Sequence, residues 1–478
     1  PAMIKENLIF FVDATIVNPD FDTQTKEYLT KKAANFGSKF EVTEKFIKGV
    51  IKTGVCDQII ANAKAREEAN LSKTDGKGRG PVRYEKLYNA HKAGTKEGYK
   101  CTLILTEGDS AKTFAMSGLN VIGRDYYGVF PLRGKLLNVR DASPKKIADN
   151  EEITAIKKIV GLEQGKVYDD LKGLRYGSIM ILADQDVDGY HIKGLIMNFI
   201  HCFWPSLVKY EGFIQSFATP LLKATKGKGK TKQVVAFTSP QSFEEWKKEN
   251  NDGKGWSIKY YKGLGTSDPA EAQECFADLN DKLVKYFWEP KKKNLESESN
   301  SKSVDSNKSK TTNKKKIESE FIEEESDIIS DTYKPKNKDI SEDAMTLAFA
   351  GGREDDRKIW INTYNPDNYL DPSKKRISYY DFIHKELITF SVDDVLRSVP
   401  NLMDGFKPSH RKVFYGSVEK NIYKQEIKVS DLTGFVSNMT KYHHGDQSLS
   451  STIVGMAQNY VGSNNLNLLM PLLSLIHI

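Results

Sequence analysis

The chain has 478 residues, of which 39% are hydrophobic and 28% charged. This length suggests about three domains, each able to bury a core. The net charge of +7 (71 basic minus 64 acidic residues) is a mild bias toward polyanions that does not by itself indicate nucleic acid. No run approaches the roughly 20 apolar residues of a membrane span, and no signal peptide is visible, which excludes a membrane protein. The four cysteines lie far apart and form no CxxC, which excludes a zinc ribbon and a disulfide scaffold and fits a reducing compartment.

Two strand–turn–helix units are predicted in chain order. Residues 71–84, rich in Gly, Lys and Arg, indicate a boundary before them. Residues 100–106 (KCTLILT) are typical of a buried parallel strand, and EGDS and a helical pattern follow. Residues 178–183 (SIMILA) form a second such strand, which leads into DQDVDG and another helix. The pattern predicts an α/β sheet, in which ligands lie at the carboxyl ends of the strands.

Two further segments have a distinct composition. Residues 226–232 (KGKGKTK) lie between two apolar runs and predict the loop of a β-hairpin or a similar surface turn. Residues 291–340 contain 12 Lys, 11 Asp or Glu and only two aromatic residues. Such a segment cannot bury enough apolar surface to offset its ordering entropy, so we expect a disordered insertion.

Four acidic residues follow the two predicted strands: Glu107 after the first, and Asp184, Asp186 and Asp188 after the second. Carboxylates that converge at one sheet edge are costly unless a cation neutralises them, and Mg²⁺ prefers oxygen ligands. The alternative is that the acids cap helices, as Asp109 and Asp188 could, but capping explains only one acid per helix. An EF-hand is rejected, because the twelfth position counted from Asp184 is a leucine.

The motifs EGDSAK, PLRGKLLNV, DQDVDG and YKGLGT together resemble the TOPRIM region of type IIA DNA topoisomerases. Upstream, FDTQTKEYLT resembles the end of the transducer domain of that family. Downstream, LMDGFKPSHRKVFYG, KYHHGDQSLSSTI and AQNYVGSNNLNLLMP resemble the start of its breakage–reunion domain. Since both parts lie on one chain, the resemblance is to the eukaryotic-type DNA topoisomerase II family rather than to bacterial gyrase.

The resemblance implies a TOPRIM Rossmann-like parallel sheet, preceded by the end of an α/β transducer domain and followed by a winged-helix α+β segment. The implied boundaries are 1–70 for the C-terminal part of the transducer domain, 71–98 for a linker, 99–290 for the TOPRIM domain and its extension, 291–340 for the disordered insertion, and 341–478 for an incomplete winged-helix breakage–reunion domain.

The family cleaves and religates both DNA strands through a phosphotyrosine link and passes a second duplex through the break, driven by ATP. The resemblance implies that Glu107, Asp184 and Asp186 hold Mg²⁺, with Asp188 as a further ligand and Mn²⁺ or Ca²⁺ as substitutes. It implies double-stranded DNA and a second copy of the chain as partners, and the nucleus or an organelle as the location.

The same comparison implies contacts with DNA and with nucleotide. The residues matched to DNA contacts are Lys135, Asn138, Arg411, Lys412, Tyr442, His443, His444 and Ser448. Gln24, Thr25 and Lys26 match a loop that reaches the ATP phosphates, and Lys262 is matched to a supporting position near the acids. Taken alone, Lys135 is more typical of an ordinary surface lysine, the adjacent Arg411 and Lys412 are typical of a solvated helix face, and the QTK segment is typical of a plain turn.

The sequence departs from the family at both ends. It begins within the transducer domain, and after Met470 and Pro471 it ends in LLSLIHI, ahead of the Arg-Tyr pair that carries the nucleophile. We therefore expect no catalytic tyrosine and no cleavage or ATP hydrolysis by this chain alone. Two rival functions stay open at this point: a nuclease or primase with the same acidic fold, and a non-catalytic DNA-binding protein.

Overall fold

The computed structural model describes residues 8–37, 41–76, 82–227, 233–289, 333–458 and 467–471, except for positions 10, 12, 14, 238–239, 262, 265–266, 334, 338, 372, 425 and 443–444. Its contacts divide the chain into two compact units. The first comprises residues 1–82 and 142–167, and the second comprises residues 83–141 and 168–478.

The first unit is helical in its described part. Its helices are η1 (Ala33–Asn35), α2 (Glu44–Lys52), α3 (Val55–Ser72), α5 (Pro144–Ala148) and α6 (Glu151–Val160). Thr43, Ser143 and Asn150 each begin a helix, because their side chains accept a hydrogen bond from a backbone N–H in the first turn. Gly161 ends α6 in the left-handed conformation that favours glycine.

A buried ion pair connects α6 to the end of α3 within this unit. The Nζ of Lys157 lies 3.2 Å from Asp75 Oδ1 and donates to Leu71 O and Thr74 Oγ1, at 2.9 and 2.7 Å. Both charged side chains are almost fully buried, with exposed fractions of 2% and 3%. Asp75 Oδ1 also accepts from the Gln164 N–H at 2.9 Å. The pair therefore fixes how the two helices approach each other.

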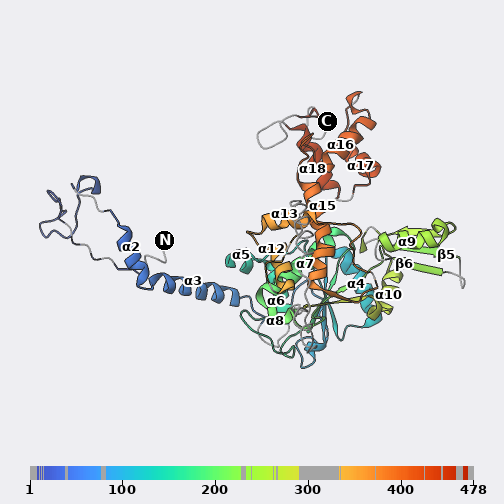
Figure 1. The fold of residues 1–478 in the computed structure, drawn as a ribbon, viewed down its shortest axis with the longest axis horizontal. Helices are drawn as coiled ribbons and strands as arrows, with labels where there is room; N and C mark the ends of the chain where they lie inside the picture. Colours follow the sequence, from blue (N-terminus) through green and yellow to red (C-terminus); the bar gives the residue numbers. More distant parts are fainter. Residues whose placement is uncertain are drawn as a thin grey trace, which may run out of the picture. The chain divides into compact units, whose positions relative to one another are not determined.

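The second unit is built on a sheet with the strand order β2-β1-β3-β4-β8-β9. Figure 1 shows the ribbon of the chain coloured along the sequence. β2, β1, β3 and β4 are parallel neighbours, β8 is antiparallel to β4, and β9 is parallel to β8. The strands are β1 (Thr102–Thr106), β2 (Tyr127–Pro131), β3 (Ser178–Leu182), β4 (Ile214–Phe217), β8 (Leu283–Phe287) and β9 (Arg376–Ser378). The predicted α/β class and the two predicted buried strands are confirmed.

Helices pack on this sheet and position its carboxyl edge. α4 (Asp109–Ile122) and α10 (Pro269–Ala277) pack against each other and share a core with β1 and β3. Gly118 of α4 is needed there, since a Cβ would lie 2.2 Å from the Phe276 ring. α7 (Val187–Phe203) contacts α8 (Pro205–Val208) and two later helices, α15 and η7. The connections also contain η2 (Gly98–Lys100) and α11 (Leu279–Lys282).

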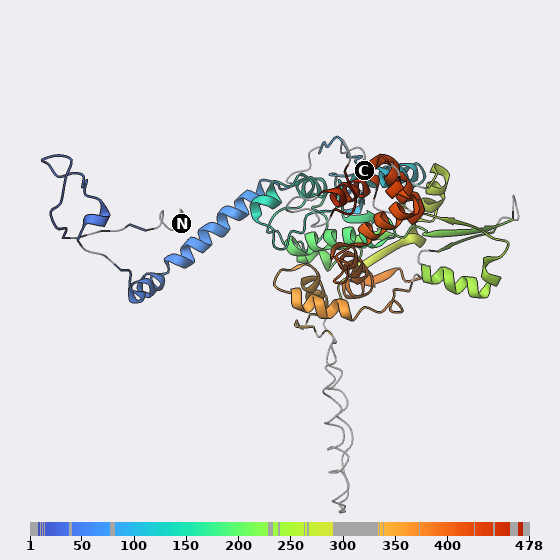
Figure 2. The ribbon, with the colours of Figure 1, turned by 90° about the horizontal axis from the view of Figure 1, so that it is seen from above.

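A second, antiparallel sheet has the order β6-β5-β7, with α9 beside it (Figure 2). Its elements are β5 (Leu222–Lys226), β6 (Gln233–Phe237), α9 (Pro240–Glu249), η4 (Asn251–Gly253) and β7 (Ser257–Tyr260). β5 pairs with β6 from Leu222↔Phe237 to Lys226↔Gln233, so the predicted hairpin is confirmed. Most of its loop, residues 228–232, lies outside the described residues.

Helices follow β8 and end in a small bundle. They are α12 (Ile340–Phe349), α13 (Glu354–Asn362), α14 (Tyr379–Asp381), the π-helix η7 (Phe382–Leu387), α15 (Ile388–Ser398), α16 (Pro408–Glu419), η8 (Ile422–Lys424), α17 (Val429–Thr440) and α18 (Asp446–Ala457). α16, α17 and α18 bury a shared core that includes Val413, Leu432, Val436, Leu449 and Ile453.

The predicted insertion, residues 291–340, falls largely outside the described residues. Its last part differs from the expectation of disorder. The Tyr333 hydroxyl donates to Asp343, and the Lys336 and Asn337 N–H groups donate to Asp343 Oδ1 at 3.1 and 3.2 Å. Asp339 caps α12 through its side chain. These polar residues are ordered because Asp343 and the helix terminus supply hydrogen-bond partners, a gain that a count of apolar residues misses.

The two units divide the chain by its internal contacts, whereas the boundaries implied by the resemblance divide it by family domain. Residues 142–167 group with the N-terminal residues, although they fall inside the expected TOPRIM range of 99–290. In the expected linker, residues 71–98, Tyr88 pairs with Val129 next to β2. The Ala90 N–H donates to the Tyr176 hydroxyl at 2.9 Å. The later part of that segment is therefore an edge of the second unit.

No helix in the described part of the chain is both long and apolar enough to cross a membrane.

We expect the Lys157–Asp75 pair to stabilise the first unit strongly. Asp75→Ala leaves a buried ammonium without its carboxylate, so it should lower the free energy of unfolding by about 3–5 kcal/mol. Adding Lys157→Met should recover much of this loss, because the second change removes the stranded charge. Urea denaturation followed by circular dichroism measures both effects.

The matched control is Glu44→Ala, which removes the exposed pair that Glu44 forms with Lys48 on α2. This change should have only a small effect, because exposed pairs are screened by water. A loss with Asp75→Ala no larger than that with Glu44→Ala would contradict the role given to the buried pair.

Candidate functional site

Two of the predicted acids meet at the carboxyl edge of the parallel sheet. Glu107 directly follows β1, and Asp184 lies two residues after β3, which pairs with β1 in parallel register. The Asp184 N–H donates to Glu107 Oε2 at 3.3 Å. Asp184 Oδ1 in turn accepts from the Leu264 N–H at 2.8 Å. The fold thus brings together carboxylates that are 77 positions apart in the chain.

The electrostatics of this pair favour a proton or a cation. Burial raises the pKa of Glu107 to about 7, and the negative charges of Asp184, Asp186 and Asp188 add to this rise. Burial also raises the pKa of Asp184, partly offset by the hydrogen bond from Leu264. Both carboxylates are therefore destabilised in their charged form when no positive charge is beside them.

Asp186 begins helix α7. Its Oδ1 accepts from the Gly189 N–H at 2.8 Å, which makes Asp186 the helix cap. Gly189 is needed at this turn, because a Cβ there would lie 2.1 Å from Asp184 O. The alternative interpretation was that Asp109 and Asp188 cap helices. Neither residue does so, because no side chain caps α4 and Asp186 caps α7.

Asp188 is held by two cations. The Arg397 guanidinium donates to its Oδ2 and Oδ1 at 3.0 and 2.8 Å, and Lys135 Nζ donates to Oδ1 at 2.7 Å. The hydrogen bonds from Arg397, followed by those from Lys135, hold the pKa of Asp188 well below its usual range. The side chains of Asp188 and Arg397 are mostly buried, with exposed fractions of 24% and 21%. Asp188 therefore differs from Glu107 and Asp184, whose hydrogen bonds within the described part of the chain come from backbone N–H groups.

Within the described residues, no three His, Cys, Asp or Glu side chains gather in a ready metal-binding arrangement. The two carboxylates that the structure joins are those of Glu107 and Asp184, and Asp186, two residues further on, has one carboxylate oxygen that does not cap α7. All of these donors are carboxylate oxygens, which suit a hard divalent cation. Lys262 lies outside the described residues. The neighbouring Gly263 approaches Asp184 so closely that a Cβ would lie 2.6 Å from Oδ2.

A cleft of about 710 Å³ opens beside the acids. One wall comes from the sheet edge and α7, and the other from α15 to α18. Its lining residues are Glu107, Gly134, Lys135, Asp188, Ile192, Arg397, Ser398, Lys407, Pro408, Ser409, His410, Lys412, Tyr442, Ser448 and Thr452. Acidic groups therefore face a basic wall across one cavity.

Four of the residues matched to DNA contacts line this cleft: Lys135, Lys412, Tyr442 and Ser448. Lys412 Nζ lies 5.5 Å from the centre of the Tyr442 ring, and the Tyr442 hydroxyl is 3.3 Å from Ser448 Oγ. Lys135 lies 4.7 Å from the centre of the Phe390 ring as well as beside Asp188. The structure thus brings together residues from sequence motifs about 300 positions apart.

The remaining matched residues lie elsewhere. Arg411 forms a two-point ion pair with Asp404, at 2.9 and 2.8 Å, and does not line the cleft. Asn138 donates to Phe349 O and accepts from the Asn198 amide, both at 2.9 Å, so both ends of its side chain are used inside the fold. His443 and His444 lie outside the described residues.

The sequence analysis missed three residues of the basic wall: Arg397, Lys407 and His410. Lys407 and His410 belong to the quoted motif LMDGFKPSHRKVFYG. The motif was recognised in the sequence, but the sequence did not reveal that these two residues line the cleft. Arg397 lies in LRSVP just upstream. Its only local signal is acids three and four positions before it, Asp394 and Asp393, with which it also pairs.

The residues matched to nucleotide contacts form an exposed turn in the first unit. Lys26 has φ +61°, and its N–H donates to Thr23 O at 3.1 Å. Thr25 Oγ1 lies 2.8 Å from Thr23 Oγ1. The side chains of Gln24 and Lys26 are exposed to solvent.

Family models match nearly the whole chain in consecutive pieces. Residues 1–78 match the family described as DNA gyrase B, and residues 102–217 match the Toprim domain. The C-terminal associated domain of TOPRIM matches residues 217–333 and 310–395. Residues 397–472 match the family described as DNA gyrase/topoisomerase IV, in its A-type subunit.

Curated relatives align with the chain over most of its length. DNA topoisomerase 2 of Saccharomyces cerevisiae is 45% identical over 98% of this chain and 29% of its own length. The enzymes of Arabidopsis thaliana and Plasmodium falciparum are 45% and 43% identical over 98% of this chain, with 28% and 30% of their own lengths covered. The chain thus spans about three tenths of these relatives.

A solved structure has the same fold. The crystal structure of the Plasmodium falciparum topoisomerase II DNA-binding, cleavage and re-ligation domain is 44% identical, with a TM-score of 0.64. It covers 82% of this chain, and this chain covers 46% of it. A nuclease or primase that shares only the acidic fold does not account for similarity that continues through residues 397–472. The chain is homologous to the Toprim and DNA-binding and cleavage region of type II DNA topoisomerases.

Proposed function

We propose that this chain supplies the metal-binding and DNA-binding parts of an ATP-dependent enzyme that changes DNA topology. The enzyme would cleave both strands through a phosphotyrosine link, pass a second duplex through the break and religate it. The observation that carries the proposal is the cleft in which Glu107 and Asp188 face Arg397, Lys407 and Lys412. Basic side chains opposite carboxylates suit a DNA phosphodiester that binds between them and reacts there.

The basic wall would hold the DNA backbone. Lys407 and Lys412 line the cleft from α16 and the residue before it, and Lys135 lines it from the opposite wall. Lysine and arginine side chains that replace counterions on phosphates give most of the affinity for DNA. Tyr442 and Ser448 add hydroxyl groups, which are common donors to phosphate and sugar oxygens.

Arg397 would position the basic wall against the acidic one. It lies near the end of α15, and its two hydrogen bonds to Asp188 hold its guanidinium at the cleft. Arg397 and Lys135 already neutralise the charge of Asp188. We therefore propose that the main role of Asp188 is to hold Arg397, and that binding a cation is a secondary role. A phosphate entering the cleft would compete with Asp188 for the same donors.

Glu107, Asp184 and Asp186 would hold a divalent cation, for which Mg²⁺ is our choice and Mn²⁺ or Ca²⁺ are substitutes. The fit rests on the donor set: within the described residues, Glu107 and Asp184 accept hydrogen bonds from backbone N–H groups and not from a cation. Burial also raises the pKa of both carboxyls. When bound, the cation would stabilise negative charge on the scissile phosphate. The chain's own residues would orient that phosphate from the basic wall.

The other parts of the proposal concern the larger protein. Gln24, Thr25 and Lys26 would contact the ATP phosphates, with the exposed Lys26 side chain as the cation. A second copy of the chain would complete the DNA gate, and the eukaryotic relatives support a nuclear location. We assign the nucleophile to none of the tyrosines in this chain.

The proposed cation site predicts an unequal response to three substitutions. Glu107→Gln and Asp184→Asn should each weaken Mn²⁺ binding by at least about tenfold, because each removes a carboxylate with no cation beside it. Asp188→Asn should weaken binding much less, since its charge is already offset by Arg397 and Lys135. Electron paramagnetic resonance of free Mn²⁺, titrated with the chain, measures all three.

Asp252→Asn, at an exposed position far from the acids in sequence, is the matched control and should leave Mn²⁺ binding unchanged. Equal losses of Mn²⁺ affinity for Asp188→Asn and Glu107→Gln would show that Asp188 contributes as much to cation binding as Glu107 does. Full binding in Glu107→Gln and Asp184→Asn would reject the site.

The cleft also distinguishes two basic residues that are adjacent in sequence, because Lys412 lines it and Arg411 does not. Lys412→Ala should weaken binding of a fluorescent DNA duplex and reduce the slope of log affinity against log salt by about one unit, as expected for one lost phosphate contact. Arg411→Ala should have a smaller effect, because the Arg411 guanidinium is directed at Asp404 outside the cleft lining. Fluorescence anisotropy at several salt concentrations gives both slopes.

Lys248→Ala on α9 is the control for a general loss of positive charge, because Lys248 is exposed and outside the cleft. An unchanged slope for Lys412→Ala, or equal effects of Lys412→Ala and Lys248→Ala, would remove the cleft as the DNA-binding surface.

A further inference from the structure

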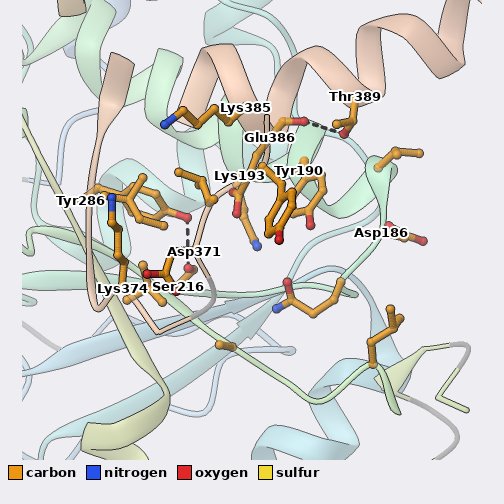
Figure 3. A pocket seen from close by; sticks show the side chains of 18 residues that line it. Asp186, Tyr190, Lys193, Ser216, Tyr286, Asp371, Lys374, Lys385, Glu386 and Thr389 are labelled. Carbon is orange, nitrogen blue, oxygen red and sulfur yellow. Dashed lines mark hydrogen bonds between the residues drawn. The ribbon is translucent and has the colours of Figure 1, made fainter. Parts of the chain in front are cut away.

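A second cavity, of about 310 Å³, lies behind the loop that carries the acids. Figure 3 shows the side chains that surround it. They come from the start of α7, from β4, β8 and β9, from η7, and from the segment before β9. The lining residues are Gln185, Asp186, Val187, Tyr190, Lys193, Ser216, Ala218, Leu221, Val284, Tyr286, Tyr369, Leu370, Asp371, Lys374, Ile377, Lys385, Glu386 and Thr389. None of them lines the DNA cleft.

A buried lysine, Lys193, points into this cavity and has no hydrogen-bonding partner among the described residues. Lys193 is only 2% exposed, and its Nζ makes no hydrogen bond or ion pair with any described residue. The Nζ lies 5.0 Å from the centre of the Tyr190 ring, and Figure 3 shows the two side chains next to each other. A lysine amine carries hydrogen-bond donors, and leaving them unused inside a protein is costly.

A buried acceptor lies in the same cavity. Glu386 Oε2 is inaccessible to solvent and has no hydrogen-bond partner in the described structure. The charges of Lys193 and Glu386 act on each other, although the two side chains form no ion pair. Burial lowers the pKa of Lys193 and raises the pKa of Glu386, so burial pushes both groups toward their neutral forms. The cavity therefore holds one hydrogen-bond donor group, on Lys193, and one acceptor, on Glu386, that are not hydrogen-bonded to described residues. Their formal charges cancel.

The rest of the lining is mixed: aromatic and apolar side chains lie beside polar and charged ones, among them Asp371, Lys374 and Lys385. The rings of Tyr190 and Tyr286 face the cavity, together with Val187, Leu221 and Ile377. The Tyr286 hydroxyl is engaged with Ser216 Oγ at 3.1 Å, which leaves its ring as the wall. A volume of this size is at the lower end of the range for small-molecule sites, in which polar groups fix the orientation of a ligand against apolar and aromatic walls.

We propose that this cavity binds a small, uncharged aromatic carboxamide. The carbonyl oxygen of the ligand accepts from Lys193 Nζ, its amide N–H donates to Glu386 Oε2, and its ring packs against Tyr190 and Tyr286. An anion would satisfy Lys193 but would place a second negative charge beside Glu386. A purely apolar ring would leave both polar groups unsatisfied. Because Asp186 and Val187 line the cavity, the ligand contacts the back of the acidic loop.

The test uses 4-fluorobenzamide as the probe and the whole chain as the receptor, followed by fluorine NMR. We expect saturable binding. Lys193→Met should weaken it by at least about tenfold by removing the donor. Ala218→Leu should weaken it similarly by filling the space, with Lys193 left intact. Lys209→Met, at an exposed lysine outside the cavity, is the matched control and should bind as the unchanged chain does. Circular dichroism checks that each variant is folded.

Two further probes test the ligand class. 4-Fluorobenzoate has no amide donor and carries a charge, and fluorobenzene has neither polar group; each should bind at least about tenfold more weakly than the amide. Tighter binding of the benzoate would overturn the proposal in favour of an anion site. Binding by folded Lys193→Met and Ala218→Leu equal to that of the unchanged chain, or no saturation up to the solubility limit, would also overturn it. These outcomes do not depend on metal or DNA binding.

Discussion

The ion pair between Asp188 and Arg397 is the interaction on which the proposed site depends. It joins the first turn of α7, at the carboxyl edge of the sheet, to the last turn of α15, 209 positions later in the chain. The residues that follow α15 include Lys407 and α16, which form the basic wall of the cleft. Together with the contacts that Phe390 makes with Lys135 and His191, this link specifies where α15 and the basic residues after it lie. The cost of burying two charges is offset by their mutual hydrogen bonds and by Lys135.

The acids at this edge fall into two groups with different electrostatic tasks. Asp188 stabilises the arrangement of helices because it is paired with cations. Glu107 and Asp184 accept hydrogen bonds only from backbone N–H groups among the described residues, and burial raises the pKa of both carboxyls. Asp186 uses one oxygen to begin α7 and so fixes the loop that presents the others. The same short sequence, DQDVDG, thus supplies a helix cap, an anchor for a distant helix and a carboxylate available to a cation.

Local pattern was enough to predict the parallel strands and the acids that follow them. The runs KCTLILT and SIMILA became β1 and β3, because all-apolar segments of that length between turns are buried on both faces. The β5–β6 hairpin followed from two apolar runs around a Gly-Lys loop. These predictions succeed because each depends on neighbours within a few residues.

The features that the sequence could not reveal depend on contacts between distant segments. Asn138 was matched to DNA, but its amide joins Phe349 and Asn198, which no local pattern reveals. Arg411 and Lys412 are adjacent in sequence, yet only Lys412 lines the cleft, because consecutive residues on a helix point in different directions. Arg397 was missed because its partner Asp188 lies in another motif.

The ends of the charged insertion are joined by hydrogen bonds, and this bears on how the family could vary in length. Trp288 Nε1 donates to Asp339 Oδ2 at 3.1 Å, and the Glu289 N–H donates to Ser341 Oγ at 3.3 Å. Just outside this junction, β8 pairs with β9 in the main sheet. Once such a junction is closed, doubling the enclosed chain costs only about 0.6 kcal/mol of closure entropy. Evolution could therefore lengthen or shorten this segment through many small mutational steps without disturbing the sheet.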